Sequence, residues 1–203
     1  MITHPGLPAP YICDFLSRED SHTRYAEGTE FHIGRIDMVA NTGTYIDSPF
    51  HRYAHGADVA GLQLQQLVDM ECLVVRIRGD GAIDATAFSD LDVRGKAVLV
   101  HTGWDAHWGT EQYLSGNPFL TERACRHLVE RGAALVGTDS LNVDSLADLS
   151  RPAHTTLLGA DVPIVEHMCN LGALPEQGAR FFAAPVAVRG MGTFPVRAFA
   201  LLG

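Results

Sequence analysis

A carboxylate and an imidazole stand four residues apart in residues 41–51, whose sequence is NTGTYIDSPFH. The carboxylate belongs to Asp47 and the imidazole to His51, and the Gly, Thr, Ser and Pro residues around them are typical of a fixed turn. If the segment is helical, both side chains share one face and can reach a single ion or water molecule. A carboxylate oxygen and an imidazole nitrogen suit Zn²⁺ or Mn²⁺. The structural alternative is that Asp47 caps a turn and that His51 is an ordinary surface histidine.

His154 and Glu166 form a second pair of residues that could carry chemistry. Glu166 ends the otherwise apolar run of residues 162–166, and burying an unpaired carboxylate is costly. The side chain therefore needs a partner. That partner is an arginine in the structural interpretation, and a metal ion or a catalytic proton in the functional one.

The loops that follow two predicted strands supply further candidates. His101 ends one strand beside Gly103 and Trp104, and Asp139 follows another strand. Such loops often carry active-site residues in α/β folds. The sequence contains no Walker loop, no G-x-G-x-x-G turn after a strand, no G-x-S-x-G elbow and no H-E-x-x-H helix. The histidines without such a context are expected to be structural or solvated: His4, His22, His55, His107, His127 and His167.

Strand-like segments recur along the chain and would position these residues. Residues 31–39 alternate apolar with polar or small residues, as a half-buried strand does. Shorter runs of apolar and β-branched residues predict buried strands. These runs are residues 72–77, 97–101, 133–136, 181–188 and 196–202.

Helices are predicted between the strands. The clearest covers residues 121–131, where Thr121 can cap the start, Ala124 and Leu128 form an apolar face, and Gly132 ends the helix. Shorter helices are predicted over residues 63–69 and 84–91, and residues 162–166 form a strand or the entry to a helix. Helices and strands that are interspersed in this way indicate a mixed α/β fold rather than an all-β sandwich.

Length and composition predict one domain, residues 1–203. The chain is 46% hydrophobic and 19% charged, and no linker-like, repetitive or strongly charged segment divides it. Its formal net charge of −9 repels phosphate backbones, so nucleic acid is excluded as an expected partner.

Location and redox state are predicted from what the sequence lacks. It has no signal-peptide pattern at its start and no apolar run long enough to cross a membrane. The four cysteines lie far apart with no C-x-x-C pair, so we expect buried, reduced thiols in a cytoplasmic protein that does not contact membranes. These cysteines are Cys13, Cys72, Cys125 and Cys169.

Taken together, these segments resemble the cyclase family that contains bacterial kynurenine formamidase and isatin hydrolase. The signature of that family, H-x-G-T-H-x-D-x-P-x-H, corresponds to N-x-G-T-Y-x-D-x-P-x-H in residues 41–51. Later family segments match in the same order over residues 30–203. They are HTGW at 101–104, GTDSLNVD at 137–144, HTTLLG at 154–159, PIVEHM at 163–168 and PVRA at 195–198.

The resemblance implies a fold, an activity and a set of site residues. The implied fold is a single-domain α/β fold of the swivelling β/β/α type with a barrel-like β core, assembled as a homodimer or homotetramer. The implied activity is metal-dependent hydrolysis of amide-like bonds with Zn or Mn. The implied metal ligands are Asp47, His51, His154 and Glu166, and the implied catalytic residues are His51, Glu166 and Tyr45. Residues expected to bind substrate are Asn41, Thr44, His101, Trp104 and Asp139.

Two signature positions depart from the family pattern, because Asn41 and Tyr45 stand where the family has histidines. An amide oxygen and a phenol are poor Zn²⁺ ligands compared with imidazole. One position of a two-metal site is therefore expected to be lost, and the remaining ligands would hold one divalent ion. In the alternative the site holds no metal, and Asn41 and Tyr45 donate hydrogen bonds to a substrate oxygen.

Three hypotheses about function follow from the sequence. The first is a hydrolase of a small amide, lactam, ester or lactone that acts through an activated water. The second is a metal-independent cyclase, lyase or isomerase that works by acid/base chemistry alone. The third is a non-catalytic protein that binds a small molecule on the scaffold of a former enzyme.

Overall fold

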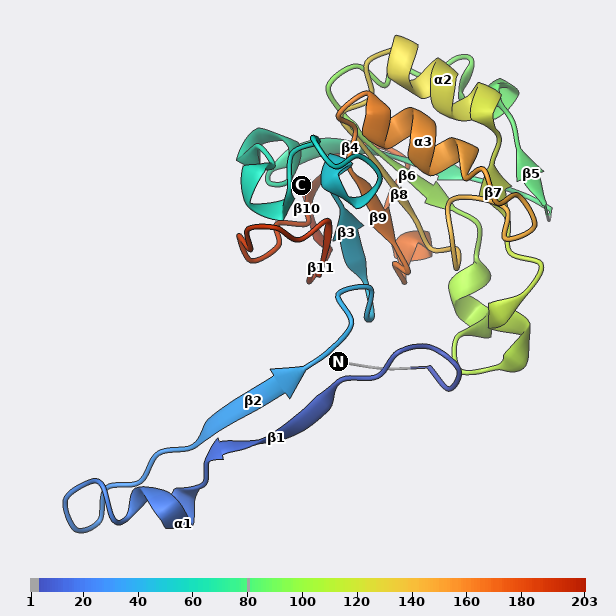
Figure 1. The fold of residues 1–203 in the computed structure, drawn as a ribbon. Coiled ribbons are helices and arrows are strands. Elements are labelled where there is room, and N and C mark those ends of the chain that lie inside the picture. Colours follow the sequence, from blue (N-terminus) through green and yellow to red (C-terminus); the bar gives the residue numbers. More distant parts are fainter. Residues whose placement is uncertain (1–3, 80) are drawn as a thin grey trace.

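Eight strands form one sheet that curls into a half barrel in the computed structural model, which describes residues 4–79 and 81–203 (Figure 1). The order of the strands across the sheet is β11-β3-β9-β8-β6-β4-β10-β12. The prediction of an α/β fold with a barrel-like β core is confirmed. The strands are β3 (Tyr45–Asp47), β4 (Met70–Arg76), β6 (Ala97–His101), β8 (Leu135–Thr138), β9 (Ile164–Glu166), β10 (Ala179–Phe182), β11 (Thr193–Pro195) and β12 (Phe199–Leu202).

The sheet is mixed in direction. Its centre, from β4 through β6 and β8 to β9, is parallel, whereas β3 and β11 on one side and β10 and β12 on the other are antiparallel to their neighbours. The parallel strands are the continuous apolar runs of the sequence, because parallel strands are usually buried on both faces.

Alternate residues of the central strands pack into two separate hydrophobic cores. The outer core lies between the sheet and the helices, and the inner core lies inside the curled sheet. In β6, Val98 and Val100 pack on the side of the helices, whereas Ala97 and Leu99 point into the curled sheet. Side chains of successive strand residues point to opposite faces, so one strand contributes to both cores. The sheet is therefore held by packing on both sides.

Two helices, α2 (Glu122–Glu130) and α3 (Pro152–Gly159), lie side by side over the outer face of the sheet (Figure 1). As predicted, the Thr121 hydroxyl accepts the Ala124 N–H at the start of α2, and Gly132 follows the helix with a φ of +82°. Helix α3 was not predicted from the sequence, which offers only Pro152 at its first position and a short apolar face. Both helices bury leucines in the outer core.

The two shorter predicted helices are only 3₁₀ turns, at Leu64–Gln66 and Ala85–Phe88. Near the first, Leu67 is buried but Leu64 is 61% exposed, so there is too little apolar face to hold an α-helix. At the second, the Asp84 side chain does not cap the turn but binds the Thr121 hydroxyl. Other 3₁₀ turns are Pro49–His51, Val59–Gly61, Trp104–His107, Glu111–Leu114 and Leu171–Ala173.

The predicted strand over residues 181–188 is too long, because β10 ends at Phe182. Pro185 follows closely, and proline has no N–H for a sheet ladder. Residues 162–166, for which a strand or the entry to a helix was predicted, contain β9, and the strands predicted at 72–77 and 97–101 are present as β4 and β6.

The N-terminal part of the described chain forms a two-stranded ribbon of β1 (Tyr11–Leu16) and β2 (Ile33–Asp37), with the short helix α1 (Arg18–Ser21) at its tip. The ribbon projects from the body of the molecule (Figure 1). Every residue of β2 is exposed, so the prediction of a half-buried strand over residues 31–39 is wrong for burial. The alternating pattern is present, but no layer formed by residues 4–79 and 81–203 packs on its apolar residues. A further small sheet pairs β5 (Ala82–Ile83) with β7 (Phe119–Leu120).

The cysteines are free thiols, of which only Cys72 and Cys125 are buried. Cys13 is partly exposed and Cys169 is exposed, so the prediction of buried thiols is wrong for these two. In the part of the chain that the structure describes, no helix has the length and apolar character needed to span a membrane.

Candidate active site

The register between β3 and β9 brings Tyr45 and Glu166 together. Tyr45 lies directly opposite Glu166 in the antiparallel pair, so both side chains point to the same face of the sheet. The Tyr45 hydroxyl donates a 2.7 Å hydrogen bond to Glu166 Oε2. Asp47 lies two residues beyond Tyr45 in β3, and the two-residue period of a strand places its carboxylate on the same face.

His154 reaches this face from the first turn of α3, where Asp144 fixes it. The Asp144 carboxylate accepts the backbone N–H of Ala153 at 2.6 Å and that of His154 at 3.1 Å. The same carboxylate lies 2.6 Å from Nδ1 of the His154 ring. A carboxylate on Nδ1 leaves Nε2 as the nitrogen available to the site, an arrangement usual for metal-binding histidines.

Asp47, His154 and Glu166 form a buried group whose donor atoms all lie within 4.8 Å of one another. His154 Nε2 is 3.7 Å from Asp47 Oδ2 and 4.0 Å from Glu166 Oε1. Within residues 4–79 and 81–203, neither carboxylate oxygen of Asp47 has a hydrogen-bond partner, although the side chain is completely buried. Leaving a carboxylate in that state is costly. One imidazole nitrogen and two carboxylates, one of them the unpartnered Asp47, fit a divalent metal ion.

His51 lies at the solvent edge of this group. It ends the 3₁₀ turn Pro49–His51 directly after β3, so the pair with Asp47 comes from a strand and a turn rather than from one helix. His51 Nε2 is 3.9 Å from Asp47 Oδ1, and its ring centre is 5.7 Å from that of His154. Its side chain is 37% exposed. The structure thus brings all four predicted ligands together, with three in the buried group and His51 beside it.

Gly192 holds the backbone of His51 in place. A Cβ atom on Gly192 would lie 2.6 Å from His51 Cα, which is closer than any real contact. Only glycine fits beside the backbone here. The loop before β11 therefore packs directly on the turn that carries His51.

The electrostatics of the group favour one added positive charge. Burial raises the pKa of Asp47, and the nearby His154 imidazole only partly offsets this effect. Burial disfavours a charge on His154, but its interactions with Asp144 and Asp47 outweigh burial and raise the pKa of His154 to about 10. Burial and the charge of Glu166 raise the pKa of Tyr45, so the phenol stays a neutral donor.

A cavity of about 410 Å³ opens beside Tyr45. Asn41, Tyr45 and Asn142 give its wall polar groups, and Trp108 and Leu146 give it apolar surface. His167 also lines the cavity, and its Nδ1 lies 2.8 Å from the Tyr113 hydroxyl. An apolar pocket with a few fixed polar groups is typical of a small-molecule site.

Of the residues predicted to bind substrate, only Asn41 lines this cavity. Its Oδ1 accepts a hydrogen bond from the Thr193 hydroxyl at 3.0 Å. Thr44 donates its hydroxyl to the His167 carbonyl at 2.7 Å and lines a second, smaller cavity instead. Thr44 therefore holds the backbone next to Glu166 from the other side.

The other residues predicted to bind substrate support the loop after β6 instead of lining the cavity. They are His101, Trp104 and Asp139. Asp139 accepts the Thr102 N–H, the Thr102 hydroxyl and the Gly103 N–H at 2.6–2.9 Å, and His101 Nε2 lies 3.8 Å away. The buried Trp104 ring donates its Nε1–H to the Tyr113 carbonyl at 3.1 Å. These contacts fix the loop after β6, and Tyr113 in turn contacts His167 at the cavity.

The sequence places Asp144 with Asp139 in a loop after a predicted strand, where active-site residues often lie, but it predicts no specific role for Asp144 and leaves His167 among the structural histidines. The spacing gave no signal for the contact of Asp144 with α3, because the N-cap position is Arg151 and Asp144 lies in the loop well before it. The signal for His167 was its place directly after Glu166 at the end of β9. Both roles depend on helix α3 and on the loop packing, which the pattern did not predict.

Comparison with known proteins identifies the family of the chain. Residues 3–145 match the profile of the family described as Putative cyclase. The kynurenine formamidase of Erythrobacter litoralis is 30% identical over 186 residues, which cover 91% of this chain and 83% of that protein.

Solved structures share the fold. Isatin hydrolase A from Labrenzia aggregata superposes with a TM-score of 0.80 at 23% identity, covering 100% of this chain and 88% of that one. A predicted metal-dependent hydrolase from Bacillus stearothermophilus superposes with a TM-score of 0.72 at 27% identity, covering 93% of this chain and 85% of that one. With the profile match, the sequence identity and the shared fold in agreement, the chain belongs to the cyclase family.

Proposed function

We propose that the chain is a hydrolase that cleaves the C–N bond of a small amide or cyclic amide with an activated water. The observation that carries this proposal is the buried Asp47 carboxylate, which has no hydrogen-bond partner in the described residues and faces His154 and Glu166. Such a group has no evident structural role. Glu166, in the same buried group, accepts a hydrogen bond from Tyr45, which lines the 410 Å³ cavity.

Asp47, His154 and Glu166 would hold one divalent ion, for which we propose Zn²⁺ or Mn²⁺ because the donors are nitrogen and oxygen. When bound, the ion supplies Lewis acidity and lowers the pKa of a water molecule towards neutrality. The chain's own contribution is to orient these donors. Asp144 keeps Nε2 of His154 directed at the site, and the Val143 N–H holds Glu166 Oε1 at 2.6 Å.

His51 is the residue that we assign to proton transfer. Hydrolysis adds water oxygen to the carbonyl carbon, breaks the C–N bond and requires a proton on the departing nitrogen. His51 Nε2 lies at the mouth of the site, 3.9 Å from Asp47 Oδ1, and can exchange protons with solvent. A base that takes the proton of the water and returns it to nitrogen meets both needs. Glu166 is the alternative base, although its two oxygens already accept hydrogen bonds.

Tyr45 and Asn41 are proposed to orient the substrate in the cavity that they line. The Tyr45 phenol is neutral and gives its one proton to Glu166 Oε2, which leaves its oxygen to accept a hydrogen bond from a substrate N–H. The Thr193 hydroxyl fixes Asn41 Oδ1 as an acceptor, which leaves the amide nitrogen to bind a substrate oxygen. Thr44, His101, Trp104 and Asp139 would act indirectly, by supporting the loops of the site.

The proposed partner is a small molecule rather than a nucleic acid or a membrane. The net charge of −9 opposes binding to phosphate backbones. The four free thiols suit a reducing compartment, so we assign the protein to the cytoplasm.

The proposal is tested with a panel of N-formyl aromatic amines, cyclic imides and lactams. Wild type is expected to hydrolyse at least one member, and Asp47→Asn is expected to lower kcat about 100-fold or more, as removal of an essential site group commonly does. Glu176→Gln, which changes a carboxylate that is 73% exposed, is the matched control and should be unaffected. Equal turnover by Asp47→Asn and wild type would contradict the proposal.

A second function is favoured by the Tyr45–Glu166 hydrogen bond, which joins two groups in a position where the family has a metal ligand. It is a metal-independent cyclase, lyase or isomerase reaction with Glu166 or His51 as base. In that case activity would survive exhaustive chelation and would be lost in Tyr45→Phe. Loss of activity on chelation, restored by added metal, would exclude it.

A further inference from the structure

His167 is held at the edge of the cavity beside Tyr45 by contacts at both ends of the residue. It directly follows Glu166 at the end of β9 and has a φ of +55°, in the left-handed region that residues other than glycine seldom adopt. Its carbonyl oxygen accepts the Thr44 hydroxyl at 2.7 Å. Its ring Nδ1 lies 2.8 Å from the Tyr113 hydroxyl. Backbone and ring are both fixed, so the ring keeps one orientation.

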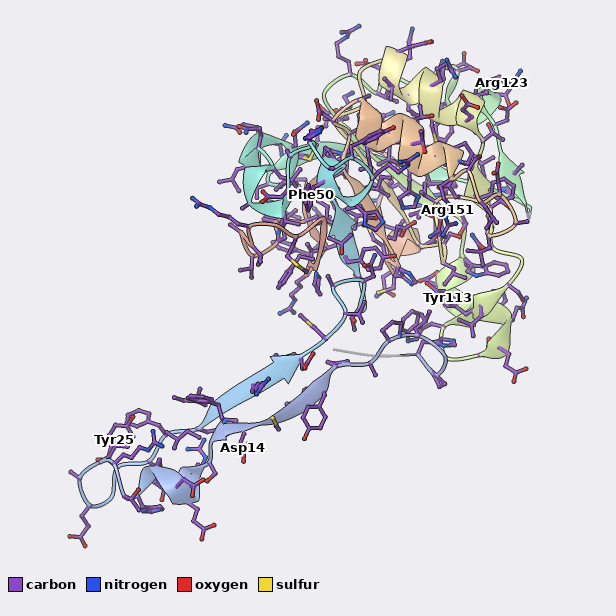
Figure 2. All side chains as sticks on the ribbon, in the orientation of Figure 1. Asp14, Tyr25, Phe50, Tyr113, Arg123 and Arg151 are labelled. Carbon is purple, nitrogen blue, oxygen red and sulfur yellow. The ribbon has the colours of Figure 1, made fainter. Side chains whose placement is uncertain are left out.

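The Tyr113 hydroxyl determines which ring nitrogen of His167 carries the hydrogen. Tyr113 comes from the 3₁₀ turn Glu111–Leu114, between β6 and β7 (Figure 2), and its burial raises the pKa of the phenol, which keeps its proton. Within residues 4–79 and 81–203, Nδ1 is the only hydrogen-bond partner of that hydroxyl. A buried hydroxyl without an acceptor is costly, so the phenol donates to Nδ1. The neutral imidazole then carries its own hydrogen on Nε2.

The Nε2–H group of His167 is a free donor at the cavity. His167 lines the cavity and Tyr113 does not, so the ring edge turned away from Tyr113 is the one that faces it. In the described part of the chain, Nε2 has no hydrogen-bond partner and is not enclosed by protein atoms. The ring centre lies 5.3 Å from that of Tyr45 and 6.1 Å from that of Trp108. The donor therefore lies among the residues that shape the cavity.

Asn142 presents a second uncharged donor. Its Oδ1 accepts the Asp144 N–H at 2.9 Å and a hydrogen bond from Arg151 Nη1 at 3.3 Å, which leaves its amide nitrogen for the cavity. The described residues that line the cavity include no Asp, Glu, Lys or Arg. A carboxylate in such a pocket would lack a charged partner, so these donors favour a neutral oxygen acceptor.

We propose that His167 is a specificity-determining residue whose Nε2–H binds a neutral carbonyl oxygen of the substrate, close to the scissile amide. This inference rests on the proposed function, because it takes the cavity as the substrate site. The acceptor lies close to the scissile amide because His167 adjoins Glu166 in the chain and its ring lies beside that of Tyr45. On an N-formyl aromatic amine, a ketone ortho to the formamide meets this condition.

The test is the binding of two matched amines, 2-aminoacetophenone and 2-ethylaniline, to the full chain by calorimetry. They are the products of the corresponding N-formyl amines, have nearly the same shape, and differ in one carbonyl oxygen. His167→Phe keeps a ring but has no donor. The preference for the ketone, taken as the ratio of the two Kd values, should fall about 10-fold in this variant, the effect of one hydrogen bond. The control His55→Phe changes an exposed histidine and should keep the wild-type ratio.

Tyr113→Phe tests how the ring is positioned. Without the phenol, the hydrogen of the imidazole is no longer confined to Nε2, so the ratio should fall in the same direction but by less than in His167→Phe. A purely structural role of Tyr113 would instead weaken the binding of both amines together and leave the ratio unchanged.

His167→Asn replaces His167→Phe if the latter does not fold, because asparagine adopts a positive φ more readily. Its shorter side chain does not reach the same point, so the ratio should also fall. A wild type that binds neither amine would overturn the proposal, as would a folded His167 variant with the wild-type ratio. If the ratio falls as expected but wild type hydrolyses no N-formyl amine, cyclic imide or lactam, the role of His167 is supported and the proposed function is contradicted.

Discussion

Tyr45 is the residue that most distinguishes this site. Its hydroxyl donates a 2.7 Å hydrogen bond to Glu166 Oε2, and burial keeps the phenol protonated by raising its pKa. The other departure, Asn41, is turned by Thr193 towards a structural hydrogen bond through its Oδ1. These two residues leave three buried donors, which suit one ion rather than two.

Restoring both histidines should therefore restore a second metal position. We expect Asn41→His/Tyr45→His to bind about two equivalents of divalent metal where wild type binds about one, since imidazole is a better ligand than amide or phenol. Metal content of the purified proteins measures this. A double variant that keeps the wild-type stoichiometry would show that these positions do not limit the metal count.

Asp144 should control metal affinity without touching the metal. Asp144→Asn weakens the contact that orients His154 Nδ1, and loss of such a partner typically costs about 10–100-fold in metal affinity. A chelator competition measures the Kd for Zn²⁺. Asp90→Asn, on an exposed turn, is the control. Unchanged affinity in Asp144→Asn would remove the positioning role.

At the scale of elements, strand register and one loop contact build the site. The register of β3 against β9 places Tyr45 opposite Glu166, and the cap at the start of α3 brings in His154. The loop before β11 supports His51 through Gly192. Each element contributes one or two residues, so the site depends on how the elements pack.

Gly192→Ala should displace the turn that carries His51. The added methyl would sit 2.6 Å from His51 Cα, and overpacking of this kind costs about 1–3 kcal/mol. We expect a lower urea midpoint together with reduced turnover. Gly61→Ala, where a Cβ would make contacts of 3.4 Å, should have little effect. Wild-type stability in Gly192→Ala would show that the backbone relaxes at no cost.

The sequence predicted the buried strands and the group of four candidate ligands, which the structure brings close together, better than the contacts that hold them. The strands at β4 and β6 are continuous apolar runs, and the signature motif points to Asp47 and His51. Helix α3 was missed because its first turn is set by Asp144, a residue outside the helix. The exposure of β2 was missed because an alternating pattern shows that an apolar face exists, and not whether another element of the fold packs on it.

At the scale of the whole molecule, the two cores should protect two thiols. Cys72 and Cys125 are buried in the inner and outer core, and burial raises the pKa of both thiols. A thiol-reactive alkylating reagent should therefore label the exposed Cys169 in the native protein. It should label Cys72 and Cys125 only in urea. Labelling mapped by mass spectrometry measures this. Labelling of Cys125 in the native protein would contradict the packing of α2 on the sheet.

The central claim is that Asp47, His154 and Glu166 hold a single metal ion. Elemental analysis of protein purified without chelator tests it most directly, with Asp47→Asn as the comparison. We expect about one equivalent of Zn or Mn per chain in wild type and a loss of most of it in Asp47→Asn, because a deprotonated carboxylate is the better ligand. Less than about 0.1 equivalent of any transition metal in wild type, with activity unchanged by EDTA, would contradict the account.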